Sequence, residues 1–478
     1  MKRYTRLLAG STTIAVLFLG ATSISAHQED NSEPKPAARE YPPLIEGLGN
    51  QDSNGDQEPA TNLNPDTRPL TGVQNPTLGT PGIRHSYWLP GFQYGNTVRS
   101  SALNQATSSG WNTTSFILGN LSLLDAWGRA QLAVNYSGGG SFSSDSAQGN
   151  SHFQQFGLVQ TFDWGRWKLY FLDQFSYLPE TQFGFGVGTG LSFPGVGGSL
   201  APPLPGLLNS YVPNQGIFTT FGPRYSNAVA TQVAYTVSPR GSITAAGSYG
   251  ILRFIEAGNI ESNDANFNVG YSYNLTRADT LGVQYSFGSY RYIGNPQAIN
   301  DQVVQFMYGR KVTGRIALQL FGGPEVTTFR VPVNNSSNRV SGSGGANLTY
   351  ASNRGSLALT YNHGVSGGSG VFAGANTDQV QSSLGRQLSR EWAASLNFGY
   401  SRSGSVASSA SSQTYDSWYV GGGLSRPFGR NTNFTVAYTA QIQTSNQTVC
   451  AAGTCSTNFT SQQITLGLQW HTRPYVLR

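Results

Sequence analysis

The stretch WGRAQLAVNY (residues 127–136) joins a tight turn to a run in which apolar and polar side chains alternate. The same pairing recurs in SNRGSLALTY (352–361), SREWAASLNFGY (389–400) and GRNTNFTVAY (429–438). Arginines in or beside such turns follow one another at gaps of 36 to 40 residues, with one gap of double length between Arg166 and Arg240. The full set is Arg129, Arg166, Arg240, Arg277, Arg315, Arg354, Arg390 and Arg430. A fixed period of this kind indicates one repeated structural unit.

Period two dominates the chain from about residue 95 onward. In LGVQYSFG (281–288), leucine, valine, tyrosine and phenylalanine alternate with glycine, glutamine, serine and glycine. One apolar face and one small polar face are typical of strands with lipid on one side and water on the other. Charged residues make up 11% of the chain, whereas soluble domains hold about 25%. A β-sandwich would have an apolar inner face and a more charged outer face. The pattern therefore predicts an all-β fold, an antiparallel up-and-down transmembrane β-barrel.

The alternating runs divide into about eighteen strands of about twelve residues, the first at 95–107 and the last at 458–470. Short connections that hold the arginines alternate with longer ones, such as 178–225, 327–338 and 367–375. Short periplasmic turns and longer external loops are typical of barrels in the bacterial outer membrane, and an even strand count places the N- and C-termini in the periplasm. A β-propeller also has a period of about 40 residues, but its strands are about five residues long.

The N-terminal part of the chain has a different character. Residues 1–26 have the basic start, short apolar run and small final residues of a signal peptide. Residues 27–92 are rich in Pro, Asn, Asp, Glu and Gly, and are predicted to be a disordered periplasmic extension, with a plug domain as the alternative. Residues 93–478 then form the barrel. Basic residues beyond the extension are spread over the turns, so no nucleic-acid partner is expected.

The turn arginines have two interpretations. They extend to lipid phosphates at the inner interface of the outer membrane, or they are ordinary polar turn residues. Cys450 and Cys455 in TVCAAGTC are expected to form a disulfide, because an exported chain matures in an oxidising compartment. The sequence holds no phosphate-binding glycine loop and no cluster of metal ligands, so no cofactor or metal is predicted.

Candidate functional residues lie in the loops and along the lumen. The connection 178–225 combines Gly and Pro with apolar stretches, and we expect it to fold into or across the barrel mouth; a flexible loop or a barrel–barrel contact is the alternative. Strict alternation places Asp173 on the lipid face, so a bulge or a rim position is expected there. His363 in TYNHG is a single rim histidine, which does not predict an enzyme. Charged side chains set ion preference in pores, and the pore-lining or rim candidates are Lys168, Arg291, Arg310, Lys311, Glu325 and Arg330.

The last alternating run, with Ile464, Leu466 and Leu468, ends on Trp470. This resembles the terminal signal that the barrel-assembly machinery recognises, although residues 471–478 continue past the aromatic. From about residue 95 to 470, the chain resembles the β-barrel porins of about eighteen strands that accompany exopolysaccharide export loci, in its signal peptide, leader, Tyr- and Ser-rich strands and tight turns. The resemblance implies an outer-membrane channel for hydrophilic solutes or polysaccharide, the latter with a periplasmic partner. A substrate-selective diffusion porin, a homo-oligomer, and a non-conducting structural or adhesive barrel remain open.

Overall fold

The structure is a computed structural model. It describes residues 86–103, 111–144, 150–178, 217, 224–255, 259–352, 354–368, 370–389, 391–406, 413–429, 431–446, 458–473 and 475–477. The predicted signal peptide, most of the predicted extension, and both cysteines lie outside the described residues. In the described part of the chain, no helix has the length and apolar character needed to cross a membrane.

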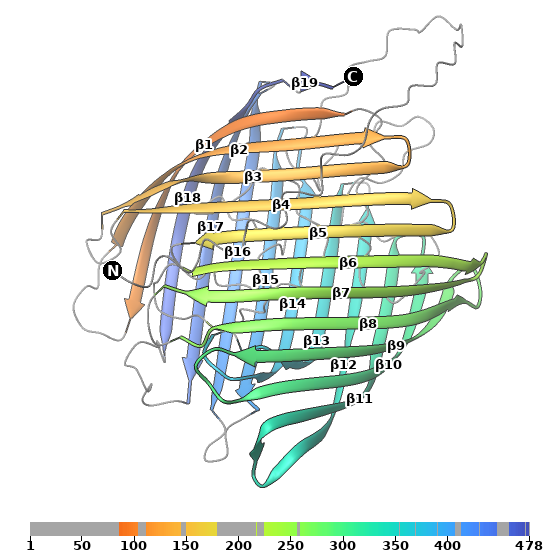
Figure 1. Cartoon of the computed structure of the whole chain (residues 1–478). Helices are drawn as coiled ribbons and strands as arrows, with labels where there is room; N and C mark the ends of the chain where they lie inside the picture. Colours follow the sequence, from red (N-terminus) through yellow and green to blue (C-terminus); the bar gives the residue numbers. More distant parts are fainter. Residues whose placement is uncertain are drawn as a thin grey trace, which may run out of the picture. The chain divides into compact units, whose positions relative to one another are not determined.

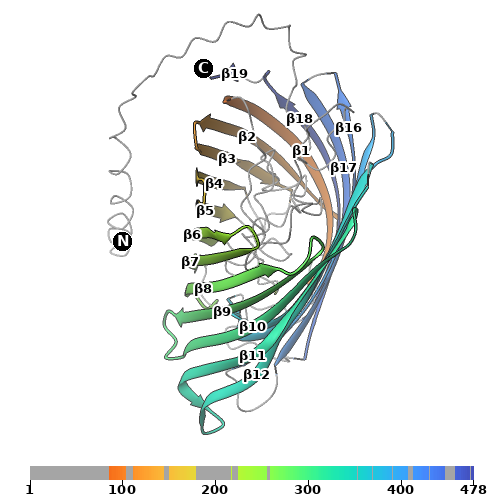
Figure 2. The same cartoon turned by 90° about the vertical axis from the view of Figure 1, so that its right-hand side faces the viewer.

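Eighteen antiparallel strands close into one barrel, in which each strand pairs with its neighbours in sequence and β1 pairs with β18 (Figure 1). Figure 2 shows β1 and β18 side by side where the barrel closes. The predicted fold class and strand number are therefore confirmed. The strands are β1 Tyr87–Leu103, β2 Trp111–Trp127, β3 Ala130–Ser143, β4 Ser151–Trp164, β5 Trp167–Leu178, β6 Arg224–Ser238, β7 Gly241–Phe254, β8 Ser262–Asn274, β9 Asp279–Tyr292, β10 Ala298–Thr313, β11 Ile316–Val333, β12 Ser336–Ser352, β13 Gly355–Ser366, β14 Ala375–Gln387, β15 Ala393–Ser405, β16 Thr414–Phe428, β17 Thr432–Ser445 and β18 Phe459–His471.

Short connections gather at one end of the barrel, which we call the short-turn end. They join β2 to β3, β4 to β5 and so on to β17, and each contains two to five residues. Each arginine of the repeat lies in one of these connections. Gly128, Gly165 and Gly429 have positive φ, a conformation that glycine adopts without steric cost and that lets the chain reverse in a few residues. We call the opposite end, with the remaining connections, the loop end.

The first strand begins earlier than the sequence predicts. β1 begins at Tyr87 rather than at residue 95, and its first residues pair with a short additional strand, β19 (Tyr475–Val476). Trp88 stacks on Tyr475 with ring centroids 4.9 Å apart. The tail that continues past Trp470 therefore adds to the sheet beside β1. Pro90 and Gly91 interrupt the alternation of apolar and polar residues before residue 95. The sequence pattern therefore does not predict this part of the strand.

The predicted loop at 327–338 was wrong. β11 and β12 continue through it and meet in a two-residue turn, Asn334–Asn335, at which both residues have positive φ. Asparagine tolerates this conformation better than most residues, and two such residues form the tight hairpin turn that matches strand twist. The β11–β12 hairpin consequently extends beyond its neighbours, as Figure 1 shows.

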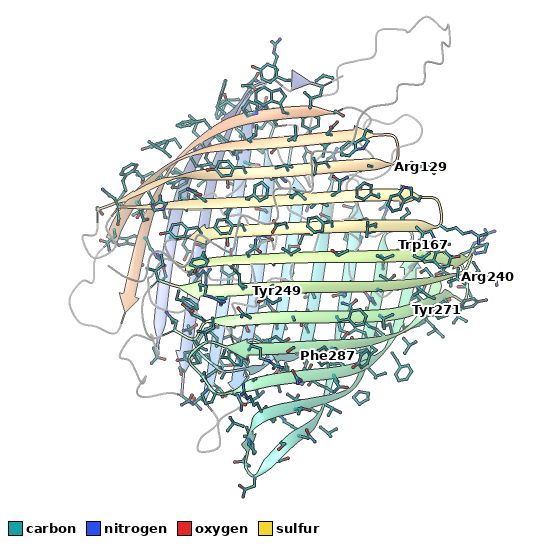
Figure 3. All side chains as sticks on the ribbon, in the orientation of Figure 1. Arg129, Trp167, Arg240, Tyr249, Tyr271 and Phe287 are labelled. Atoms are coloured by element: carbon teal, nitrogen blue, oxygen red, sulfur yellow. The ribbon has the colours of Figure 1, made fainter. Side chains whose placement is uncertain are left out.

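The outer face of the barrel is apolar and is bordered by aromatic side chains. At the short-turn end, Trp164 lies opposite Trp167, and Trp167 packs on Tyr235 at 4.4 Å. At the loop end, Tyr400 packs on Trp418 at 4.3 Å. Figure 3 shows Trp167 and Tyr249 on this outer face, with Arg129 and Arg240 at the short-turn end. An apolar belt between two aromatic rows is the outer surface of a barrel that spans a bilayer.

Asp173 lies on this outer face, and the bulge or rim position expected for it was wrong. The pairing of β5 with β4 and with β6 is continuous along the whole strand, so strict alternation holds at Asp173. Asn227 Nδ2 donates a hydrogen bond to Asp173 Oδ1 at 2.9 Å. A neighbouring amide on β6, rather than an irregular strand, therefore accommodates the carboxylate.

Candidate functional site: the barrel interior

Polar side chains hydrogen-bond to one another across neighbouring strands on the inner face. Thr97 and Thr465 join β1 to β18 at 2.9 Å, and Ser417 Oγ donates to Gln443 Oε1 at 3.1 Å. Because adjacent strands present these groups side by side, the inner wall has a continuous polar lining over β14–β18 and β1. This wall corresponds to the small polar face that the alternating pattern predicts.

An apolar row crosses the inner face of the strands that follow β1. Leu124, Ala133, Val159, Leu172 and Ala230 lie directly opposite one another on β2 to β6. Val159 and Leu172 have 0% exposure. These side chains pack against one another and against Tyr170 in one cluster. The expectation of a uniformly small and polar inner face was therefore incomplete.

The connection between β13 and β14, residues 367–374, lies inside the barrel; we call it the inward segment. Its Gly370 carbonyl accepts a hydrogen bond from the Ile260 amide at 2.7 Å, although Ile260 belongs to the connection between β7 and β8. Phe372 packs against Tyr415 on the inner face of β16, with ring centroids 5.6 Å apart. The segment thus contacts strands on both sides of the interior near the loop end.

Glycines allow the inward segment its tight fit. Gly368, Gly370 and Gly374 have positive φ, a region that side chains with a Cβ disfavour. A Cβ at Gly370 would overlap the Phe254 ring, and one at Gly374 would overlap Ile299. Since both neighbours face inward from β7 and β10, the segment has no room for larger residues at these positions.

A residue of the long connection between β5 and β6 is buried in the same region. Ile217 is 2% exposed and packs with Phe372, Ala375 and Tyr415. The strands that this connection joins lie half-way round the eighteen-strand barrel from β14 and β16. The sequence predicted that the connection 178–225 folds into or across the mouth; the contacts of Ile217 agree with that prediction, and most of the connection lies outside the described residues.

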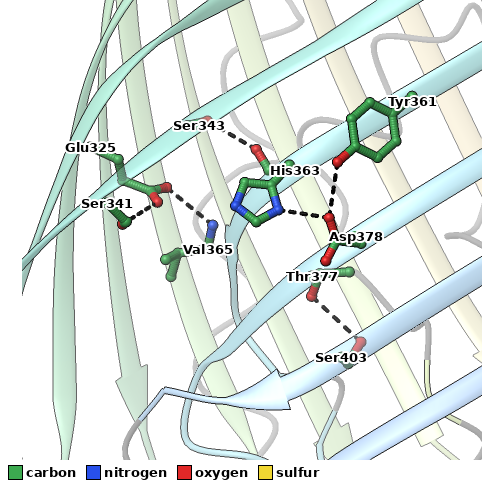
Figure 4. Close-up of polar contacts among 9 residues, drawn as sticks. All are labelled: Glu325, Ser341, Ser343, Tyr361, His363, Val365, Thr377, Asp378 and Ser403. Atoms are coloured by element: carbon green, nitrogen blue, oxygen red, sulfur yellow. Dashed lines mark hydrogen bonds and ion pairs between the residues drawn. The ribbon is translucent and has the colours of Figure 1, made fainter.

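Three buried carboxylates lie on the inner wall beside the inward segment: Asp264 on β8, Asp301 on β10 and Glu325 on β11. Glu325, 1% exposed, accepts hydrogen bonds from Ser341 Oγ at 2.8 Å and from the Val365 amide at 3.1 Å (Figure 4). The Val365 amide has no β12 partner, because the pairing of β12 with β13 ends at His363. Glu325 therefore fastens the end of β13, just before the inward segment, to the wall.

His363 lies on the outer face. Its Nδ1 is 2.7 Å from Asp378 Oδ1, and the Tyr361 hydroxyl donates to the same oxygen at 3.0 Å (Figure 4). Among the residues that the structure describes, no hydroxyl or thiol is bonded to the His363 ring. The arrangement is a polar rim at the loop end and supplies no nucleophile for catalysis.

The charged candidates divide between the two faces and do not form one site. Glu325 is on the inner wall at the loop end, and Lys311 faces inward near the short-turn end. Lys168 also faces inward there, with its Nζ 3.4 Å from Asp163 Oδ2. The remaining candidates, Arg291, Arg310 and Arg330, face outward at strand ends. Sequence reasoning did not identify the inward segment, although its run GGSGVFAG combines closely spaced glycines with a central aromatic.

The turn arginines are exposed. Arg129, Arg166, Arg240, Arg277, Arg315 and Arg354 have exposed side chains, and no ion pair joins them to another residue in the described ranges. Arg390 and Arg430 lie outside the described residues. The guanidinium groups that can be located thus surround the short-turn end, next to the aromatic row of the outer face.

The described residues contain no group of three or more histidine, cysteine or acidic side chains arranged to hold a metal ion. No protein-family model matches the chain, and no curated protein matches it. Solved structures with a similar arrangement include Pseudomonas aeruginosa OpdK with vanillate, 7% identical, with a TM-score of 0.41 over 80% of this chain and 99% of that chain. Two others are P. aeruginosa OccK2 (OpdF), 8% identical, TM-score 0.41, over 81% and 98%, and Acinetobacter baumannii OccAB3, 8% identical, TM-score 0.40, over 82% and 100%. At these values the likeness assigns the chain to no family.

Proposed function

We propose that the protein is an outer-membrane channel for small hydrophilic solutes. The observation that carries the proposal is the polar inner wall of a closed barrel whose outer face is apolar. Eighteen strands enclose enough space for an aqueous passage. The inward segment and Ile217 occupy part of that space at the loop end, which favours small solutes over a polymer chain. Polysaccharide export, which the sequence resemblance implied, has no further support.

Single-channel recording of the refolded mature chain in a planar bilayer tests this function. We expect stable open steps, smaller than those of a barrel of the same strand number without inward segments, because current has to pass beside residues 367–374. Block by added sugars would show that neutral hydrophilic solutes enter. Folded, heat-modifiable protein without any steps would contradict the proposal.

The second candidate is a non-conducting structural or adhesive barrel. Bulky inward-facing side chains favour it, since Phe116, Phe153, Tyr415 and Tyr419 are fully buried on the inner wall. These aromatics are spread over β2, β4 and β16, whereas the polar wall over β17, β18 and β1 has mostly small or flexible side chains. We favour the channel because the side chains of this wall are polar and hydrogen-bond to one another across the strands, which suits a surface beside water.

The orientation that fits this function places the short-turn end in the periplasm, with the signal peptide removed and barrel assembly acting on β18. We propose that the turn arginines there contact phosphates of the inner leaflet, since no acidic side chain among the described residues neutralises the six that are located. The aromatic row beside them supports this proposal, because such rows lie at the depth of lipid headgroups.

Exchanging Arg129, Arg166 and Arg240 together for glutamine tests this lipid contact. In vesicles that contain phosphatidylglycerol, we expect the free energy of unfolding to fall by about 1 kcal/mol for each arginine. In neutral vesicles the change should be much smaller, because no anionic headgroup is lost as a partner. Urea titration in both kinds of vesicle measures the free energy of unfolding. The matched variant with lysine at the same three positions should unfold with the same free energy as the unaltered protein. Equal losses in both lipids would instead favour a role confined to the turns.

A further inference from the structure

Asp173 is a carboxylate on the apolar outer face, far from both ends of its strand. It lies six residues from Trp167 and four from Tyr177 along β5, and both aromatics face outward from that strand. With a rise of about 3.3 Å per residue and a tilt of about 40°, the carboxylate is about 15 Å from one aromatic row and about 10 Å from the other. Asp173 is therefore at the depth of lipid hydrocarbon.

Its surroundings in this chain only partly satisfy the carboxylate. Leu158 and Val229 lie directly opposite Asp173 on the two neighbouring strands. Asn227 Nδ2 donates to Oδ1, and the same nitrogen also donates to the Gln174 carbonyl at 3.2 Å. Hydrocarbon supplies no further donors, so a carboxylate at this depth is costly unless another protein surface covers it.

Two ion pairs on the outer face lie at strand ends. Arg310 with Asp279 is at the short-turn end, and Arg402 with Asp416 is at the loop end. Water or lipid headgroups can reach both of these pairs. The depth of Asp173 thus distinguishes it from these exposed pairs and calls for a different partner.

A hydrogen-bond donor lies on the same cross-strand row. Asp173 is opposite Val229, and Val229 is opposite Tyr249 on β7. Adjacent strands are about 4.8 Å apart, so the carboxylate and the tyrosine flank Val229 at similar distances on either side. Tyr249 is 51% exposed and faces outward, as Figure 3 shows.

We propose that this face is an interface between two copies of the chain, with the twofold axis passing close to Val229. A rotation of 180° about an axis along the membrane normal brings Tyr249 of each copy toward Asp173 of the other. Donor and acceptor therefore meet twice, as a self-complementary twofold contact requires. The reach of the tyrosine ring spans the difference in height that strand tilt creates along the row.

The surface beside this row permits close approach. Thr231 and Gly247 lie opposite each other, and a Cβ at Gly247 would have no neighbour nearer than 3.9 Å. Small residues on a lipid-facing surface let two membrane proteins come into backbone contact and bury polar groups between them. The interface depends on the lipid-facing outer surface and is independent of whether the interior conducts.

Cysteine cross-linking in intact outer membranes of expressing cells tests the interface. Val229→Cys, in a Cys450→Ser, Cys455→Ser background, is expected to form a covalent dimer on oxidation, since residues beside a twofold axis face their own copies. Leu396→Cys is the matched control, because Leu396 is an exposed lipid-facing residue on the far wall. Heat-modifiable migration on gels confirms that each variant is folded.

Two further substitutions separate a specific contact from random collision. Asp173→Leu and Tyr249→Phe should each lower the dimer yield of Val229→Cys several-fold, while Asp173→Leu should leave the folded monomer at least as heat-stable as before. Equal cross-linking at Val229→Cys and Leu396→Cys would overturn the proposal. So would a dimer unaffected by Asp173→Leu, the absence of any dimer, or a covalent adduct with a different protein. Conductance by the monomeric variant would leave the channel function intact.

Discussion

Arginine in place of Leu396 is expected to lower the free energy of unfolding in a bilayer by about 2–4 kcal/mol, the cost of a base at the middle of a lipid-facing strand. Leu396 is 51% exposed and lies on β15, four residues after Trp392 and four before Tyr400. Its neighbours across the strands are Leu384 and Gly422, which offer the guanidinium no acceptor side chain. Urea titration of the barrel in vesicles, followed by tryptophan fluorescence, measures the loss.

The adjacent residue provides the control. Asn397 faces inward, opposite Ser383 and Gly421, where small neighbours leave room for a longer side chain. Asn397→Arg should therefore change the free energy of unfolding by much less than Leu396→Arg. Equal losses, or a larger loss at Asn397, would show that the apolar face of β15 does not meet lipid.

Replacing Gly374 by valine is expected to displace the inward segment and to raise the single-channel conductance. A valine there needs a positive φ, which costs about 1–2 kcal/mol for a residue with a Cβ. Its side chain would also overlap Ile299 and crowd Val406, which adds about 1–3 kcal/mol. The segment is held by separable contacts at the loop end, so it can move without opening the barrel.

Larger and noisier current steps in planar bilayers would reveal this displacement. Gly314→Val is the matched control, since a Cβ at Gly314 would meet nothing within 4 Å in its short turn. We expect the control to conduct like the unaltered protein. If Gly374→Val also conducted like the unaltered protein while remaining folded, the inward segment would not limit the current.

The strands and their order were predictable because two periods coincide in the sequence. Alternation distinguishes the faces, and the arginine turns mark every second connection. The prediction failed where one signal conflicted with another. At 327–338, the run PVNNSSN has the composition of a loop, yet Asn334 and Asn335 form a two-residue turn between long strands.

The interior was less predictable for a physical reason. Alternation shows only that the two faces of a strand differ. Where both faces are apolar, as at Val159 on β4, it does not predict which residues face inward. Contacts of the inward segment join residues more than 100 positions apart, such as Gly370 and Ile260. Nothing in the local composition of 367–374 specifies those partners, although its glycines permit the fit.

The β11–β12 hairpin has a consequence at the scale of the cell surface. Its strands contain 18 and 17 residues, whereas a tilted strand needs about 9–11 to cross the hydrocarbon. Residues 334–340 at its tip are exposed, and strand pairing holds Asn338–Val340 against β11. In the proposed orientation, an antibody or a bacteriophage approaching the cell would meet a preformed, rigid epitope there, while the solute passage stays recessed behind it.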